Sequence, residues 1–231
     1  MGLPGITPYP MPDTVPANRV AWTADPGRAA LLIHDMQNYF VDAFTRDVSP
    51  IPELVANILA LRSRCASLGI PVVYTAQPGA QTLAQRGLLQ DFWGDGIPAE
   101  PRAAEIIAPL RPGDADIHLT KWRYSAFQRT SLAGTLADLG RDQLIVTGIY
   151  AHIGCLMTAS EAFMRDIETF FASDATADFS ADHHAMALTY AADRCSVVVS
   201  TADLLTMLAR RRASVTGSAS VTGSASVTGV G

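Results

Sequence analysis

The sequence lacks the features that mark secreted and membrane proteins. Its 231 residues include only three cysteines, Cys65, Cys155 and Cys195, which are odd in number and widely spaced in apolar segments. This pattern favours buried free thiols in a reducing cytoplasm over a disulfide framework. No apolar run approaches the roughly 18–20 residues of a membrane-spanning helix, and no basic region precedes an apolar core at the N-terminus. We therefore expect a cytoplasmic protein with no membrane span.

An excess of basic residues is also missing. The formal net charge is −5, with 17 lysines and arginines against 22 aspartates and glutamates. A nucleic-acid-binding protein presents a basic face, so this balance argues against a nucleic-acid partner. Any anionic ligand must be met by a few local cations.

A metal site is not expected either. His183 and His184 lie near Asp174, Asp178 and Asp182, but this spacing matches no established set of metal ligands. A charged face at the start of a helix explains the cluster better.

What the chain does contain is an alternation of strand and helix patterns, typical of one α/β domain. Six strands separated by helices predict a doubly wound, three-layer parallel sheet with helices on both faces. The predicted strands cover about 29–34, 70–75, 116–120, 143–148, 169–173 and 195–200. The predicted helices cover 51–68, 132–139, a segment from the turn at 149–155 to 167, 182–193 and 202–212.

Three segments differ in composition. Residues 1–27 are rich in proline and weakly periodic, so we expect an extended N-terminal arm. Residues 28–212 form the predicted domain. Residues 213–231 repeat Ser-Val-Thr-Gly-Ser-Ala and contain nothing that forms a core, which indicates a linker, tag or tail.

The stretch around Asp35 organises the predicted sheet. Leu31 to Ile33 is a short apolar run of the kind buried on both faces of a central parallel strand. The run stops at His34 and Asp35, which places a carboxylate at the C-terminal end of that strand. Ligands of open α/β sheets bind at this edge. Asp35 is therefore the first candidate for chemistry, and His34 is more typical of a packed, hydrogen-bonded histidine.

Two further segments lead to the same edge. Lys121 follows the third predicted strand, and the connection from Gln77 to Pro101 is long, rich in glycine and proline, and carries Trp93. Connections of that length are usually functional or disordered, and the aromatic residues favour a structured active-site loop.

Several motifs in order along residues 3–208 make the chain resemble the isochorismatase family, the pyruvate-releasing branch of the cysteine-hydrolase-like superfamily. The motifs are LIHDMQNYF at 32–40, YTAQPG at 74–79, DFWG at 91–94, LTKWRYSAF at 119–127, GRDQL at 140–144, GIYAHIGC at 148–155 and DATADFS at 174–180. The likeness is strongest to isochorismatases that supply 2,3-dihydroxybenzoate for catecholate siderophores.

The resemblance implies a cofactor-free hydrolase. It would split the enol-pyruvyl ether of isochorismate into pyruvate and 2,3-dihydro-2,3-dihydroxybenzoate. It also implies a homodimer or larger oligomer. Relatives with two activities carry an aryl carrier domain, but no Asp-Ser-Leu-type phosphopantetheine site follows Arg212 here. Either this is a stand-alone or trimmed hydrolase domain, or a carrier protein or synthetase partner lies on another chain.

The resemblance assigns catalytic roles to Asp35, Lys121 and Gly154. Asp35 would be the general acid that protonates the vinyl carbon, which requires a raised pKa from burial or nearby anions. Lys121 would hold a substrate carboxylate and stabilise developing charge, although a lysine close to Asp35 would lower the pKa of that acid. The amide of Gly154, at a helix N-terminus, would help to bind the pyruvyl part.

Five side chains are predicted to bind the substrate. Arg86 would pair with a carboxylate, Gln77 would donate a hydrogen bond, Trp93 would close the pocket against water, and Tyr150 would hydrogen-bond the ligand. Phe40 completes this set. The role of Arg123 stays open between binding and structure.

The reaction class depends on Cys155. In amidases of the superfamily a cysteine at this turn is the nucleophile, but counting back from Thr158 and Ala159 places that position at Gly154. One residue along a helix rotates a side chain by about 100°, so Cys155 is expected to face the helix–sheet packing. The resemblance also implies a cis peptide at Ile149–Tyr150.

Three other functions stay open. The first is the phenazine-pathway hydrolase that acts on 2-amino-2-deoxyisochorismate, whose motifs overlap almost completely. The second is a cysteine amidase of the nicotinamidase type. The third is a non-catalytic docking partner for a carrier protein.

Overall fold

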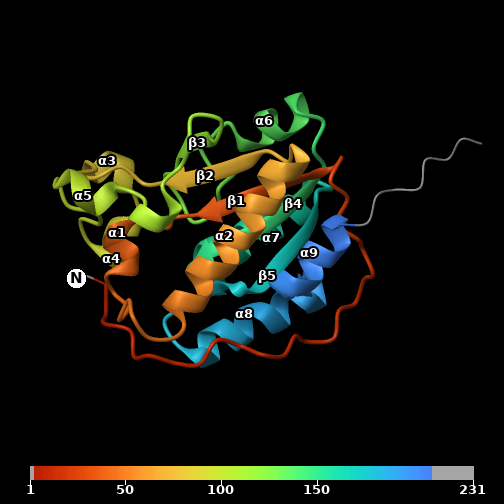
Figure 1. The fold of residues 1–231 in the computed structure, drawn as a ribbon. Helices are drawn as coiled ribbons and strands as arrows, with labels where there is room; N and C mark the ends of the chain where they lie inside the picture. Colours follow the sequence, from red (N-terminus) through yellow and green to blue (C-terminus); the bar gives the residue numbers. More distant parts are fainter. Residues whose placement is uncertain (1–2, 210–231) are drawn as a thin grey trace, which may run out of the picture.

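A computed structural model describes residues 3–209. Its centre is a single parallel sheet of six strands in the order β3-β2-β1-β4-β5-β6 (Figure 1). The order reverses between β1 and β4, which makes this pair the switch point of a doubly wound sheet. The strands are β1 (Ala29–His34), β2 (Val72–Ala76), β3 (Ile117–Thr120), β4 (Gln143–Ile149), β5 (Glu168–Ala177) and β6 (Val197–Val199). The predicted three-layer α/β fold is confirmed.

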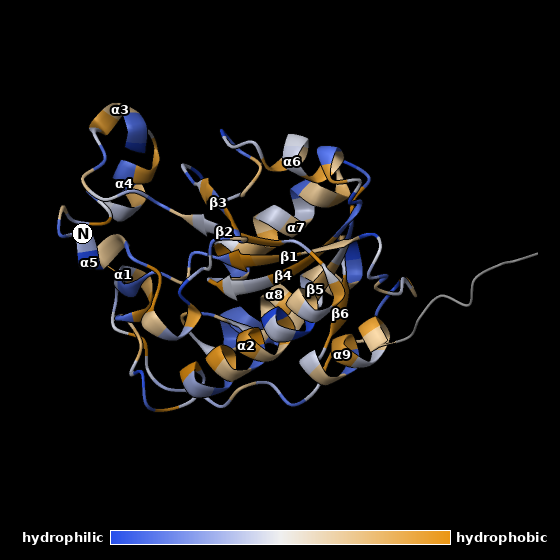
Figure 2. Ribbon diagram, turned by 45° about the horizontal axis from the view of Figure 1, so that its top comes forward, coloured by the Kyte–Doolittle hydropathy of each residue, from blue (hydrophilic) through white to orange (hydrophobic). Residues whose placement is uncertain are grey.

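Helices cover both faces of the sheet, so the central strand is buried on each side. Leu31 and Ile33 of β1 pack in the core beneath α2 (Ile51–Leu68) and α9 (Thr201–Ala209). Ala30 and Leu32 point the other way, into the core beneath α6 (Leu132–Asp138), α7 (Leu156–Phe163) and α8 (Ala181–Arg194). Figure 2 shows these apolar strands enclosed by helices. Burial on both faces explains the continuous apolar run that the sequence shows here.

The helix boundaries follow local signals in the sequence. Pro52 lies in the first turn of α2, and Gly69 ends that helix with a left-handed φ of 66°. Ser180 caps α8, because its hydroxyl accepts a hydrogen bond from the His183 amide.

Strand β5 is longer than predicted, running to Ala177 instead of stopping near 173. Its polar C-terminal half resembles a turn in the sequence. In the fold these polar groups are satisfied: the Asp174 carboxylate accepts hydrogen bonds from the amide and hydroxyl of Thr201, and the Thr176 hydroxyl donates to the Ala172 carbonyl. The strand can therefore continue through them.

The long connection after β2 is structured. It contains α3 (Leu83–Arg86) and α4 (Leu89–Trp93), with α5 (Pro101–Ala104) at its end. The remaining short elements are α1 (Asn38–Val41), a 3-10 turn at Ala108–Leu110 and a π-helical turn, η2 (Ala151–Cys155).

The N-terminal segment is extended and wraps the outside of the domain (Figure 1, red). Ile6, Tyr9 and Ala24 are buried against the main core. The predicted tail, 213–231, and the predicted domain end at 212 lie outside the described residues. No helix in the described part of the chain is long and apolar enough to cross a membrane.

Candidate active site

A pocket of roughly 600 Å³, open mouth included, lies at the C-terminal edge of the sheet. Its position at the switch point between β1 and β4 is where open α/β sheets bind ligands. All eight residues predicted to form the site line it. The lining residues are Leu3, His34, Asp35, Tyr39, Phe40, Gln77, Arg86, Leu89, Trp93, Gly96, Ile97, Lys121, Arg123, Tyr124, Ile149, Tyr150, Ile153, Gly154 and Phe179.

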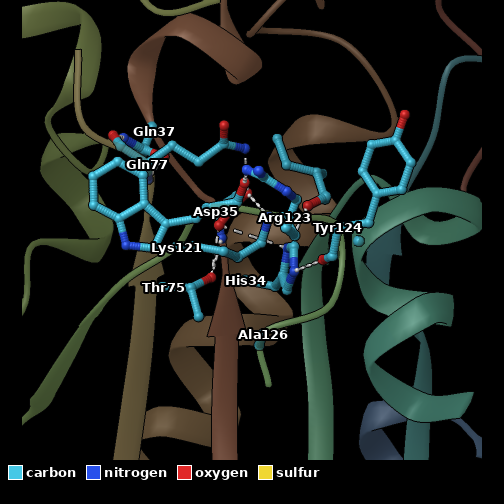
Figure 3. Close-up of polar contacts among 12 residues, drawn as sticks. His34, Asp35, Gln37, Thr75, Gln77, Lys121, Arg123, Tyr124 and Ala126 are labelled. Carbon is cyan, nitrogen blue, oxygen red and sulfur yellow. Dashed lines mark hydrogen bonds and ion pairs between the residues drawn. The ribbon is translucent and has the colours of Figure 1, made fainter. Parts of the chain in front are cut away.

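Asp35 lies at the floor of this pocket, 4% exposed, where three neighbouring strands end (Figure 3). The Lys121 ammonium is 2.8 Å from Oδ2 of Asp35. The hydroxyl of Thr75 donates to Oδ1 at 2.6 Å, and the side-chain amide of Gln77 donates to Oδ2 at 3.1 Å. The carboxylate is therefore buried but fully paired.

This pairing determines the charge state of Asp35 in the absence of a ligand. Burial raises the pKa of the carboxyl, but the charge of the Lys121 ammonium and the hydrogen bonds from Lys121 and Thr75 outweigh burial and bring the pKa to about 2. The protein groups alone therefore do not give Asp35 the raised pKa that a general acid requires. For Asp35 to act as an acid, a bound anion would have to raise its pKa.

The pocket carries more positive than negative charge. Among the described lining residues, Asp35 is the one acidic group, and Lys121, Arg86 and Arg123 are the cationic ones. Burial lowers the pKa of His34 to about 4, so this histidine is neutral at pH 7. Three cations against one carboxylate leave a surplus of two positive charges.

Arg86 contributes to this surplus and forms no ion pair with a carboxylate among residues 3–209, although Asp95 is near enough to act on it electrostatically. It is 3% exposed, and its guanidinium donates to the backbone carbonyls of Gly94 and Leu89. Gly96 leaves room for it, since a Cβ there would lie 2.6 Å from Nη1 of Arg86. A buried guanidinium bonded only to neutral carbonyls is suited to bind an anion.

Arg123, whose role the sequence left open, holds the loops together as well as lining the pocket. Its Nη1 donates to the carbonyls of Gln85 and Trp122. A further hydrogen bond links the same loops, from the indole N–H of Trp93 to the Tyr124 hydroxyl at 2.7 Å. The α3–α4 segment is thereby fastened over the pocket.

The Tyr150 hydroxyl hydrogen already has a partner, so the predicted hydrogen bond to a ligand would be one that the hydroxyl oxygen accepts. Its hydroxyl donates to the Phe40 carbonyl at 2.8 Å. Its ring instead lies against Phe179, with ring centroids 4.2 Å apart, and near Phe40 and Phe44. Tyr150 therefore serves as part of an aromatic wall.

Cys155 faces away from the pocket, as predicted. Its thiol is fully buried in the core between the sheet and α7, 3.9 Å from the Thr147 carbonyl oxygen. Burial raises its pKa well above the ordinary value, so the thiolate is suppressed. Gly154, which carries no side chain, lines the pocket in its place.

The turn at 149–155 contains the predicted cis peptide at Ile149–Tyr150. It offers fewer free amides than a helix N-terminus was expected to provide. The His152 amide donates to the Asp178 carboxylate, and the amides of Ile153 and Cys155 donate to the Tyr150 carbonyl. Anion binding here would rest on the Gly154 amide with little support from its neighbours.

The sequence reasoning missed two residues that shape the site. Thr75 pairs with His34 across β1 and β2, so its place at a strand end next to Asp35 was a usable signal. Phe179 follows β5 and packs on Tyr150 and Trp93. Because the predicted strand ends near residue 173 and β5 runs to Ala177, Phe179 was not expected at the strand end beside the site.

The histidines near α8 form a hydrogen-bonded structure. His184 is buried between the Tyr9 hydroxyl and the Thr176 hydroxyl, and His152 pairs with Asp178 at 2.6 Å. Within residues 3–209 no group of three or more His, Cys, Asp or Glu side chains is placed to hold a metal ion.

Comparison with known proteins shows the family of the chain. The model of the isochorismatase domain matches residues 29–203. The chain is 58% identical to an isochorismatase of Bacillus subtilis over 93% of this chain and 70% of that protein. It is 48% identical to the phenazine biosynthesis protein PhzD1 of Pseudomonas aeruginosa, over 88% of this chain and 99% of that one. It is also 48% identical to enterobactin synthase component B of Escherichia coli, over 89% and 73%.

A solved structure shows the same fold at low sequence identity. The cysteine hydrolase of Pseudomonas syringae superposes with a TM-score of 0.73 at 23% identity, covering 83% of this chain and 96% of that one. Among residues 3–209 no cysteine lines the pocket, and the isochorismatase domain model matches most of the chain. The chain therefore belongs to the isochorismatase family.

Proposed function

We propose that this protein hydrolyses the enol-pyruvyl ether of isochorismate to pyruvate and 2,3-dihydro-2,3-dihydroxybenzoate, in the supply of a catecholate siderophore. The observation that carries the proposal is the surplus of two positive charges in a pocket whose floor holds one buried carboxylate. Isochorismate brings two carboxylates, so its binding would neutralise the pocket. A neutral ligand would leave the buried Arg86 guanidinium without an anion, which is costly.

The substrate itself would make Asp35 an acid. Two added carboxylates near Asp35 raise its pKa, because like charges disfavour ionisation. If one of them also engages Lys121, the attraction that holds the pKa of Asp35 at about 2 is shared with the ligand. Asp35 would then take up a proton as the substrate binds.

The chemistry follows from that proton. Protonated Asp35 donates it to the nucleophilic CH2 carbon of the enol ether, which produces an oxocarbenium ion. Water adds to this ion, and the resulting hemiketal collapses to pyruvate and the dihydrodiol, returning one proton. Lys121 and Arg86 hold the carboxylates, Gln77 keeps Asp35 oriented through its 3.1 Å hydrogen bond, and Trp93 with Phe40 limits the entry of water.

The aminated analogue of the phenazine pathway is a weaker candidate. It adds an ammonium group, and Asp35, the acidic side chain of the lining, is already bonded to Lys121, Thr75 and Gln77. The new cation would lack a counter-ion.

An amidase mechanism is less well supported still. It needs a nucleophilic thiol in the pocket, and the Cys155 thiol is buried in the core on the far side of its own turn. A docking role without catalysis would leave the buried Asp35–Lys121 pair without a purpose.

The setting of the enzyme is also part of the proposal. The three cysteines Cys65, Cys155 and Cys195 are buried and free, which suits a reducing cytoplasm. We expect a homodimer, measurable by light scattering on a size-exclusion column, and a carrier protein or synthetase on another chain as the partner.

The test is a pyruvate-release assay on isochorismate, its 2-amino analogue and nicotinamide, the last followed by ammonia release. The proposal expects the highest kcat/KM with isochorismate and no amide hydrolysis. A clear preference for the 2-amino analogue would replace the substrate assigned here, and ammonia release would replace the reaction class.

A further inference from the structure

We propose that His34 and Gly154 form a coupled pair: the imidazole occupies the space that a side chain at position 154 would need, and through this packing His34 positions Asp35. The inference rests on the proposed function only for its kinetic readout. His34 is thus a positioning residue, which acts on the reaction through its neighbour.

The steric relation is direct. A Cβ built on Gly154 would lie 2.1 Å from Cε1 of His34, and 2.7 and 2.9 Å from its two ring nitrogens. Carbon atoms in contact need about 3.5–4.0 Å, so any side chain at 154 must displace the ring by more than 1 Å. The imidazole and a nucleophile at this position therefore exclude each other.

The ring has little freedom to move away. Its Nδ1 is 2.8 Å from the Ile149 carbonyl oxygen, and its Nε2 is 3.3 Å from that of Tyr124. His34 is 1% exposed, and a neutral imidazole donates from one nitrogen only. The shorter contact assigns the proton to Nδ1, so displacement of the ring would leave the buried carbonyl of Ile149 without its donor.

A second glycine fixes the backbone of His34. A Cβ on Gly148 would lie 2.2 Å from the carbonyl oxygen and 2.7 Å from the amide nitrogen of His34. The next residue, Asp35, has a left-handed φ of 48°, so the chain turns sharply just after this contact. Gly148 leaves room for the main chain of His34 and Gly154 leaves room for its ring, which is held near the Ile149 and Tyr124 carbonyls; this packing sets the direction in which the Asp35 carboxylate points.

The consequence concerns the reaction that the pocket supports. With the imidazole in place, no side chain from position 154 stands between Asp35 and a bound ligand, and the carboxylate faces the reacting carbon directly. Position 154 must be glycine because the His34 ring fills the space that any side chain there would occupy, and the placement of Asp35 depends on that ring.

A double-mutant cycle of Gly154→Ala and His34→Ala tests the coupling. Gly154→Ala alone should lower kcat about a hundredfold, because a 1 Å misplacement of a catalytic group costs that much, with a smaller change in KM. In the His34→Ala background the same change should have almost no further effect on kcat, since the ring it displaces is gone. Gly134→Ala is the matched control, because a Cβ there meets nothing within 4 Å.

A spectroscopic readout tests the pair without any substrate. The buried Nδ1–H of His34 should give an exchange-protected proton resonance in the full-length protein, present in Gly134→Ala and lost in Gly154→Ala. If His34→Ala does not fold, His34→Asn replaces it in the cycle, as the shorter amide clears position 154 and can still donate to Ile149.

Independent, multiplicative effects of the two substitutions, or an unchanged resonance in Gly154→Ala, would overturn the coupling. An unmodified protein that releases no pyruvate from isochorismate would refute the proposed function instead. The resonance experiment would then still decide the present inference.

Discussion

Two features of Asp35 shift the pKa of its carboxyl in opposite directions. It is buried, which favours the neutral acid, and it is paired with Lys121, Thr75 and Gln77, which favours the carboxylate. Among the protein groups the pairing outweighs burial, and the pKa of Asp35 is about 2. In the mechanism proposed above, a dianionic substrate would reverse this balance, and acid catalysis would depend on the charge of the substrate.

Replacing Asp35 by asparagine should abolish turnover, with a loss of at least about a thousandfold in kcat, because the proton donor is removed. Binding should remain measurable by calorimetry, since Lys121 and Arg86 are unchanged. The exposed Asp91→Asn is the control. Residual activity above a tenth of the unmodified rate would exclude Asp35 as the acid.

Cys155 offers the complementary residue-scale test. Cys155→Ala should retain most of the activity, and iodoacetamide should leave the unmodified enzyme active, because this thiol lies in the core and no thiolate takes part. Pyruvate release before and after alkylation measures both effects. A variant that is folded by circular dichroism yet inactive would show that the residue assignment is wrong.

At the scale of elements, the N-terminal arm is fastened beside the site by a hydrogen-bond chain. The Tyr9 hydroxyl donates to or accepts from His184 at 3.3 Å and accepts from the Asp178 amide at 2.7 Å. Asp178 in turn holds His152 at the turn that leads into α7. The arm thereby supports the back of the aromatic wall.

Removing that hydroxyl tests the role of the arm. Tyr9→Phe should lower the free energy of unfolding by about 1–3 kcal/mol, because the buried Asp178 amide loses its acceptor. Urea denaturation measures the change. Tyr190→Phe, at a tyrosine that is 48% exposed, should change stability by less than about 0.5 kcal/mol. Equal effects of the two substitutions would contradict the structural role of the arm.

For the whole molecule, two buried histidines make stability depend on pH. Burial lowers the pKa of both His34 and His184 to about 4. The folded pKa lies below the ordinary 6.5, so the unfolded chain binds more protons between these values. The stabilisation is therefore complete above about pH 6.5 and is lost as the pH falls towards 4.

The expected loss is on the order of 3 kcal/mol for each histidine. Asp35 adds a further loss between about pH 4 and 2, since its folded pKa is also lowered. Urea midpoints across this range measure the effect. His184→Gln should flatten the dependence between pH 6.5 and 4, whereas substitution of the exposed His118 should not. An unchanged slope in His184→Gln would contradict this account.

The sequence by itself determined the fold class and the location of the site. The apolar run at Leu31–Ile33 ends at Asp35, and parallel strands deliver their ends to one edge, so Asp35 and Lys121 could be placed together without coordinates. The position of the nucleophile in related amidases, combined with the rotation of one residue along a helix, was enough to predict that Cys155 faces away from the pocket. These properties are local, because they follow from the period of a strand or helix and from where it stops.

Only the tertiary structure decided the electrostatics and the occupied volumes. Four features depend on segments that lie apart in the chain. They are the low pKa of Asp35, the hydrogen bond from the Tyr150 hydroxyl to Phe40, the binding of the Arg86 guanidinium by backbone carbonyls, and the His34 ring packed against Gly154. A pKa sums all nearby charges and the local burial, and a steric exclusion depends on distances of a few tenths of an ångström. The spacing of residues along the sequence gives neither the sum of nearby charges nor the distances between atoms.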